Sequence, residues 1–102
     1  MMIIDGVNVD DIQIDLSFLE KDRLVLHNDD HNGFYHVMAC LVVIVDISAA
    51  RAYEIAIRTH SYGSSIIMYD DSDKNLSEIG YRLTEHGLSC TLESIHKNQQ
   101  NG

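Results

Sequence analysis

Basic residues are scarce in this 102-residue chain, and they form no cluster anywhere along it. Seven lysines and arginines stand against sixteen aspartates and glutamates, which gives a formal net charge of −9 at pH 7. A surface with this charge repels a phosphate backbone, because bringing like charges together raises the free energy of association. The composition therefore argues against nucleic acid as a partner.

Long apolar runs are also missing. The longest, Val42–Val45 with its neighbours, is far shorter than the roughly 20 apolar residues that a membrane-spanning helix needs. The first residues, MMIIDGVNVDD, contain none of the basic residues with which a secretory signal begins. We therefore expect a soluble, cytoplasmic protein that has no membrane partner.

Cysteines are few and far apart. Cys40 and Cys90 have no CxxC spacing, and each lies inside an apolar segment. This arrangement is typical of reduced core thiols in a cytosolic protein, although the spacing alone leaves a disulfide open. Aromatic residues make up 7% of the chain and apolar residues 45%, which at this length fits one small domain with one modest core.

Apolar periodicity and turn residues predict the order β-α-α-β-α-β. Strands are predicted at 23–28, 66–69 and 88–92, and helices at 34–45, at 49–61 and between the turn at 70–73 and Gly87. The first helix has apolar residues at helical spacing, although Val42–Val45 is β-branched enough to pass for a strand. Ser48 is predicted to cap the second helix and Gly63 to end it. The fold class is therefore α+β, a three-stranded antiparallel sheet with helices packed on one face.

The two ends of the chain differ in composition from residues 23–94, which we interpret as the folded domain. In residues 1–22, Ile12, Ile14 and Leu16 alternate with polar residues, which predicts either an N-terminal arm or an added edge strand. Residues 95–102 have little to bury beyond Ile95 and are predicted to be a flexible tail.

Polar side chains crowd the turn between the first strand and the first helix, HNDDHNGF at residues 27–34. Such a composition is typical of turns, and Asp30 or Asn32 could cap the helix that follows. In an extended segment alternate side chains share a face, so Asn28, Asp30 and Asn32 are expected to point together and Asp29 elsewhere. These acceptors, with a neutral imidazole from elsewhere in the chain, would suit the three donors of an ammonium group.

Other chemistries fit this turn less well. An EF-hand loop that starts at Asn28 would place Ala39 where calcium needs a bidentate glutamate. A transition-metal site could draw on His27, His31 and His36, but the sequence has neither HExxH nor a Cys/His quartet. No nucleophile lies in a recognisable catalytic motif. We therefore expect no enzymatic activity, no metal and no cofactor.

Three motifs together resemble the ClpS family, the N-degron adaptors of Clp proteases: NDDHNGF at 28–34, the HxxG of His60-Ser61-Tyr62-Gly63, and CTLE at 90–93. The similarity covers roughly residues 23–94 and implies the same β-α-α-β-α-β fold. It also implies an adaptor that captures proteins beginning with Leu, Phe, Tyr or Trp. The partner that receives them would be the N-terminal domain of an AAA+ unfoldase of the ClpA or ClpC type.

The resemblance assigns roles to ten residues. Asn28, Asp30 and His60 would hold the α-amino group, with Asp29 adding negative potential. Six others would line a pocket for the first side chain: Asn32, Phe34, Val37, Ala56, Thr59 and Leu88. From the residues alone, His60 fits an ordinary helix-end histidine. The alternative function is an interaction module of the same fold that binds a Clp chaperone or another partner without recognising N-degrons.

Overall fold

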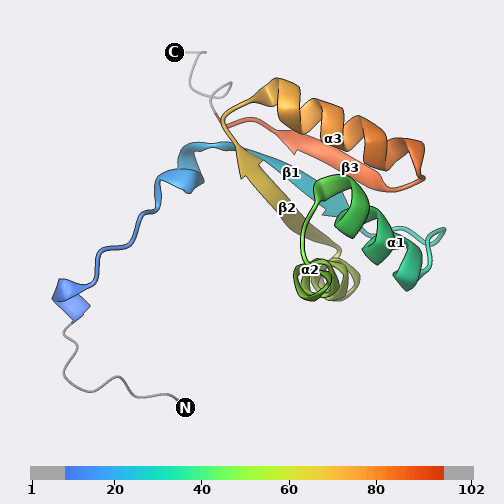
Figure 1. Cartoon of the computed structure of the whole chain (residues 1–102), viewed down its shortest axis with the longest axis horizontal. Helices are drawn as coiled ribbons and strands as arrows, with labels where there is room; N and C mark the ends of the chain where they lie inside the picture. Colours follow the sequence, from blue (N-terminus) through green and yellow to red (C-terminus); the bar gives the residue numbers. More distant parts are fainter. Residues whose placement is uncertain (1–8, 96–102) are drawn as a thin grey trace.

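The computed structural model describes residues 9–95, which fold as a three-stranded antiparallel sheet with three α-helices (Figure 1). The elements are β1 (Asp22–His27), α1 (Phe34–Cys40), α2 (Ala49–Tyr62), β2 (Ser64–Asp70), α3 (Asp73–Glu85) and β3 (Ser89–Glu93). The predicted α+β class and the order β-α-α-β-α-β are confirmed. None of the helices within residues 9–95 is long and apolar enough to cross a membrane.

The first strand of the chain is the central strand of the sheet, whose order is β2-β1-β3. The pairing of β1 with β2 contains a bulge, because Leu24 pairs with Met68 whereas Val25 pairs with Ile66. The extra residue, Ile67, is buried in the core. Since side chains alternate across a sheet, Val25 and its partner Ile66 lie on the face opposite to Leu24. We call this face, which α2 borders, the outer face of the sheet.

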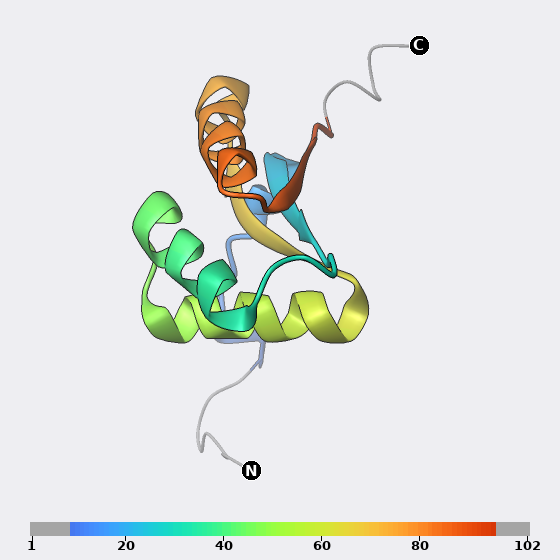
Figure 2. The same cartoon turned by 90° about the vertical axis from the view of Figure 1, so that its right-hand side faces the viewer.

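The helices pack on the other face, where the core lies (Figure 2). α3 contacts β3 and β1, α2 contacts β2, and α1 packs against α2. The largest fully buried side chains come from both layers: Leu24, Leu26, Leu41, Ile55, Leu76 and Leu83. Each contributes about 1.5–3 kcal/mol by leaving water, so this small cluster holds the two layers together.

The helix predicted over 34–45 is present, but its last turn is wider than an α-helical turn. α1 ends at Cys40 and continues directly as a π-helical turn, Leu41–Val45. The turn buries Leu41 and Ile44 and leaves Val43 exposed. Asp46, at φ 65° and ψ 49°, then takes the left-handed conformation and ends the helix. The β-branched run therefore forms a helix with altered hydrogen bonding rather than a strand.

The predicted capping residues of α2 are both confirmed, although the helix ends at Tyr62, one residue beyond the predicted 49–61. The Ser48 side chain accepts a hydrogen bond from the Arg51 backbone N–H at 3.1 Å, so it is the N-cap. At the other end, Gly63 has φ 91° and donates its N–H to the Thr59 carbonyl at 2.9 Å. The carbonyl of Gly63 accepts from Asn28 N–H at 2.9 Å, which joins the end of α2 to the loop after β1.

Both cysteines are free thiols. Cys40 is buried and Cys90 is partly buried. Burial raises the pKa of both thiols, that of Cys90 to about 11. They are therefore protonated at neutral pH and serve as small core side chains, as the sequence predicted.

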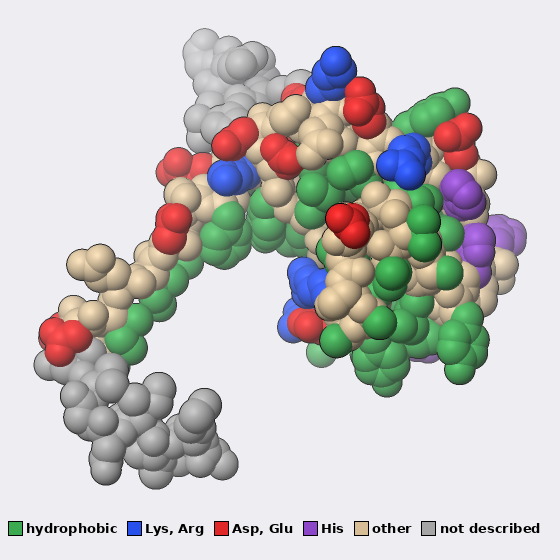
Figure 3. Space-filling view, in the orientation of Figure 1, with side chains coloured by type: hydrophobic (Ala, Val, Ile, Leu, Met, Phe, Trp, Pro, Cys, Tyr) green, Lys and Arg blue, Asp and Glu red, His purple; other side chains and the backbone are tan. Residues whose placement is uncertain are grey.

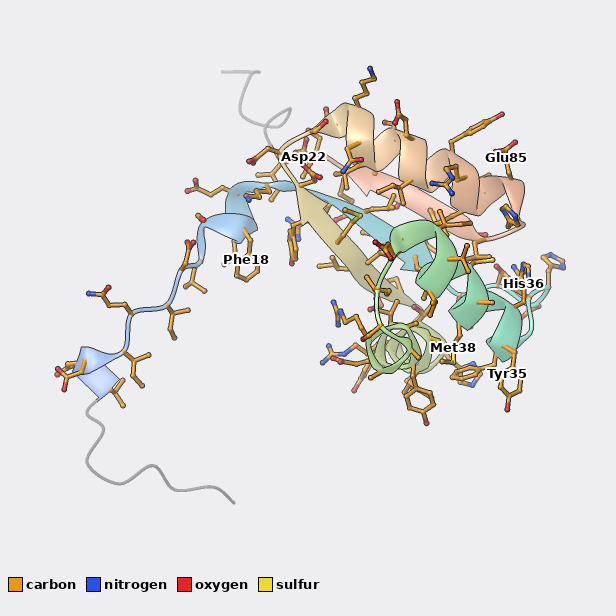
Figure 4. The ribbon with its side chains drawn as sticks, in the orientation of Figure 1. Phe18, Asp22, Tyr35, His36, Met38 and Glu85 are labelled. Atoms are coloured by element: carbon orange, nitrogen blue, oxygen red, sulfur yellow. The ribbon has the colours of Figure 1, made fainter. Side chains whose placement is uncertain are left out.

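Residues 9–21 form an extended segment that leads away from the sheet, and we call it the arm (Figure 1). It contains two 3₁₀ turns, Val9–Asp11 and Ser17–Glu20, and no strand. Phe18 and Lys21 of the arm contact the domain. The Phe18 ring packs edge-on against Tyr69 of β2 at 5.0 Å between centroids (Figure 4), and Lys21 pairs with Asp71 at 3.8 Å. Residues 1–8 and 96–102 lie outside the described residues, so the division into arm, domain and tail stays a prediction.

A pair of glycine substitutions tests the ending of α2. Gly63→Ala should lower the free energy of unfolding by about 1–2 kcal/mol, because alanine is strained at a φ of 91°. Gly33→Ala is the matched control, since Gly33 has φ −71° and open space around an added Cβ. It should be neutral or stabilising by about 0.4–1 kcal/mol. Urea unfolding measures both, and equal midpoints for the two variants would contradict the assignment.

Candidate functional site

A cavity of about 390 Å³ opens where the end of β1, the loop after it, the start of α1 and the last turns of α2 meet. Its lining comes from three separate parts of the sequence: Leu26, His27, Asn28, Asp29, Asp30, Asn32, Phe34, Val37, Ala56, Ile57, Thr59, His60 and Leu88. All ten predicted site residues are in this lining. The structure thus brings them together around one space, while the role of each stays a prediction.

The polar end of the cavity is built by residues 28–32 and by His60. Asn28 and Asp30 are exposed on the loop, and His60 is exposed in the last turn of α2. Amide and carboxylate oxygens accept hydrogen bonds, and a neutral imidazole accepts one at its unprotonated nitrogen. This end of the cavity is therefore rich in acceptors.

Asp29 organises the loop by accepting several hydrogen bonds inside it. Its Oδ1 accepts the backbone N–H of His31 at 2.9 Å and that of Asn32 at 3.0 Å. Its Oδ2 accepts the Asn32 side-chain amide at 2.9 Å. Burial alone would raise the pKa of the Asp29 carboxyl, but these hydrogen bonds outweigh it and hold the pKa below the ordinary value.

The Asn32 side chain connects this loop to a distant part of the chain. Its Nδ2 also donates to the Gly87 carbonyl at 2.7 Å, between α3 and β3. We call the set Asp29, Asn32 and Gly87 the Asn32 bridge. Gly87 has φ 90°, and a Cβ added there would lie 3.4 Å from the Asn32 Oδ1. The bridge fixes the loop beside Leu88, which follows Gly87 and lines the apolar end of the cavity.

Two expectations about this loop are wrong. The N-cap of α1 is Gly33, which makes no side-chain hydrogen bond, and not Asp30 or Asn32. A cap needs a side-chain oxygen at the helix N-terminus, and the bridge instead holds the Asn32 amide beside Gly87. The expected alternation also fails, because the loop turns and the Asp29 carboxylate meets the Asn32 side-chain amide, which was expected to point the other way.

The apolar end of the cavity is formed mainly by buried residues. Ala56, Thr59 and Leu88 are 5%, 5% and 3% exposed. The Thr59 hydroxyl donates to the Ile55 carbonyl at 2.8 Å, so its one donor is used within the helix. Phe34 stands at the rim, 37% exposed, with its ring edge-on to Tyr53 at 5.6 Å between centroids. This end offers an apolar surface to a ligand.

Three lining residues were missed by the sequence analysis: Leu26, His27 and Ile57. Ile57 lies three residues before His60, so helical spacing could have indicated it. Leu26 and His27 end the central strand, and only the position of that strand in the sheet brings them to the cavity.

The histidines near the loop have separate partners. His27 Nε2 lies 2.7 Å from Thr91 Oγ1. His36 Nε2 lies 2.7 Å from the His86 carbonyl, and this contact joins α1 to the end of α3 (Figure 4). Within residues 9–95 no group of three or more His, Cys, Asp or Glu side chains is placed to hold a metal ion. The arrangement gives the metal hypothesis no support.

The structure is a small α+β domain with a cavity that has a polar and an apolar end, and comparisons with known proteins name its family. Residues 20–91 match the family model described as "ATP-dependent Clp protease adaptor protein ClpS". The ClpS protein of Synechococcus elongatus is 29% identical over 72 residues, which are 70% of this chain and 75% of that protein. The chain therefore belongs to the ClpS family, the non-catalytic adaptors of ATP-dependent Clp proteases.

A solved structure shows the same fold at a lower level of sequence identity. The structure of Agrobacterium tumefaciens ClpS2 bound to L-phenylalaninamide matches with a TM-score of 0.59 and 21% identity. The match covers 72% of this chain and 96% of that chain. At this sequence identity the similarity shows a shared fold, and it does not show that this chain binds the same ligand.

Substitution of Asp29 tests its part in ordering the loop. Asp29→Ala should speed hydrogen exchange at the backbone amides of His31 and Asn32, which would lose their acceptor. Asp30→Ala is the matched control, because within residues 9–95 its carboxylate accepts no such bonds. NMR-detected exchange measures both variants. Equal protection in Asp29→Ala and Asp30→Ala would contradict the ordering role.

The lowered pKa of Asp29 also predicts a pH dependence. The carboxylate form is favoured in the folded state, so its stabilising effect is complete above the ordinary pKa of 3.8. The effect is lost as the pH falls through the lower, folded-state pKa. On acidification below pH about 4, the unaltered chain should lose more stability than Asp29→Ala does, which urea unfolding at several pH values measures.

Proposed function

We propose that the cavity binds the first residue of polypeptides with a free α-amino group and a large apolar side chain, Leu, Phe, Tyr or Trp. The chain would deliver these polypeptides to the N-terminal domain of a Clp unfoldase of the ClpA or ClpC type. The observation that carries the proposal is a single cavity with an acceptor-rich end and an apolar end. A first residue is the part of a polypeptide that has a charged amine directly beside a side chain.

The α-amino group would bind at the polar end. Asn28, Asp30 and His60 offer an amide oxygen, a carboxylate and an imidazole nitrogen, and together they match the three donors of an ammonium group. Hydrogen bonds to a charged group are each worth about 1.5–3 kcal/mol. Asp29 would contribute negative potential, because its carboxylate is held ionised by the loop.

The first side chain would enter the apolar end. A cavity of about 390 Å³ lies within the range of small-ligand sites, roughly 300–1,000 Å³. Ala56, Thr59 and Leu88 would form its floor, with Phe34 and Val37 at the side and Asn32 at the loop. Burying a Leu or Phe side chain there contributes about 1.5–3 kcal/mol.

The amine gives the site its discrimination. Acetylation removes the positive charge and two of the three donors, and it would leave Asp30 facing a blocked group. An unpaired, desolvated carboxylate costs several kcal/mol, more than most changes of one apolar side chain for another. Only a free N-terminus should therefore bind well.

The family membership and the related solved structure both support this proposal. Membership of the ClpS family supports a Clp partner. The ligand in the Agrobacterium tumefaciens structure, L-phenylalaninamide, has a free α-amine and an aromatic side chain, the same two chemical features that the cavity suits. A cytoplasmic location stays a prediction, as does the role of residues 1–22 as an arm outside the adaptor domain.

The second candidate function is an interaction module of the same fold that binds a Clp chaperone or another partner and does not recognise N-degrons. In that case the cavity would bind no peptide, and the chain would act only through its surfaces. A direct binding measurement separates the two candidates.

Peptide binding with three variants tests the proposal. A peptide that begins with Phe and is labelled near its other end should bind by fluorescence polarisation, and its acetylated twin should not. His60→Ala and Asp30→Asn should each weaken binding about 10- to 100-fold, the loss expected for one charge-assisted hydrogen bond. His31→Ala, an exposed neighbour outside the lining, should bind as the unaltered chain does.

Two outcomes would reject the proposal. Equal binding of the free and acetylated peptides would show that the amine is not recognised. No binding of either peptide, by a chain that still binds the N-terminal domain of its unfoldase, would favour the interaction module.

A further inference from the structure

The outer face of the sheet meets α2 in a second hollow of about 480 Å³, which we call the outer groove. Arg51, Arg58 and Tyr62 of α2 border it, and Val25, Ile66 and Tyr69 of the sheet form its floor. It shares no lining residue with the cavity described above. A bordered, partly apolar hollow of this kind suits an extended segment with apolar side chains on one side.

Positive charge is concentrated around this groove in an otherwise acidic chain. Three of the four arginines lie here. Arg51 and Arg58 line the groove, and Arg23 stacks on the floor residue Tyr69 at 5.7 Å from the ring centroid. Glu54 and Glu93 offset part of this charge through ion pairs with the arginines. The site is therefore less negative than the rest of the surface and favours an acidic occupant over a basic one.

The arm has the complementary pattern. Val9, Ile12, Ile14 and Leu16 are 79%, 48%, 70% and 53% exposed, so a row of apolar side chains is left without a partner in this conformation. All charged side chains of the arm before Lys21 are acidic: Asp10, Asp11, Asp15 and Glu20. Figure 3 shows hydrophobic side chains along the side of the arm that faces the domain, with acidic side chains on the other side.

The base of the arm is already attached at the groove. Phe18 packs on Tyr69, a floor residue, and Lys21 lies 3.8 Å from Asp71 just after β2. Residues 9–17 span about 30 Å when extended. The part of α2 that borders the groove, from Arg51 to Tyr62, is about 17 Å long. The arm is thus long enough to follow the whole groove by turning at residues 17–20.

We propose that the outer groove is the docking surface for residues 9–17 of the same chain, which close onto it with Ile12, Ile14 and Leu16 toward its floor. Attachment at Phe18 makes this an intramolecular step, so even a segment with an intrinsic dissociation constant of about 1 mM would be docked for much of the time. The acidic residues of the docked arm lie near the arginines at the groove border. The open arm is then one of two positions of this segment.

A single tryptophan can report docking, because the chain contains none. Ile14→Trp should show blue-shifted emission and several-fold weaker quenching by acrylamide than Val43→Trp. Val43 is the matched control, since it is 74% exposed on the π-helical turn and does not line the groove. Equal quenching of the two tryptophans would overturn the proposal.

A second pair of measurements identifies what the arm contacts. Adding Arg51→Gln and Arg58→Gln to Ile14→Trp should return emission and quenching to those of Val43→Trp, with unchanged circular dichroism. Protection that survives both substitutions would overturn the groove as the docking surface. Protection that disappears on hundredfold dilution would instead show docking onto a second copy, and would overturn the intramolecular step.

Discussion

The candidate site depends on one side-chain amide. Asn32 uses the two N–H donors of its amide to join the Asp29 carboxylate to the Gly87 carbonyl, so a loop after β1 is fixed to the turn before β3. β1 is the central strand, so the loop at its end and the turn before β3 lie side by side. The link between them forms one wall of the cavity, and α1 and α2 form the other. Together with the hydrogen bond from the Asn28 N–H to the Gly63 carbonyl, the bridge sets the position of the loop acceptors relative to His60.

Two neighbouring carboxylates in this loop have different environments. Asp29 faces inward to N–H donors, which keep it ionised and use its lone pairs. Asp30 is exposed and keeps its acceptor capacity for a ligand. The sequence shows only two adjacent aspartates, and the turn of the chain between Asp29 and Asn32 decides which of them is structural.

Local signals in the sequence were enough for the elements of the fold. Ser48 and Gly63 mark the ends of α2 through capping and a left-handed residue, and both effects depend on a few neighbouring residues. The bulge at Ile67 and the π-helical turn after Cys40 were not predicted, because packing between layers sets them. The ten cavity residues came from a family resemblance, whereas Leu26 and His27 reach the cavity only through the central position of β1.

The two proposed binding surfaces lie on opposite sides of α2. At about 100° per residue, Arg58 lies about 200° around the helix from Ala56, and Arg51 and Tyr62 lie within about 40° of Arg58. Ala56, Thr59 and His60 face the cavity, so a ligand there cannot touch an arm in the outer groove. The helix between them is buried along its core side at Ala52 and Ile55. Substitutions at Arg51 and Arg58 should therefore leave peptide binding unchanged, since separated sites without shared partners act additively.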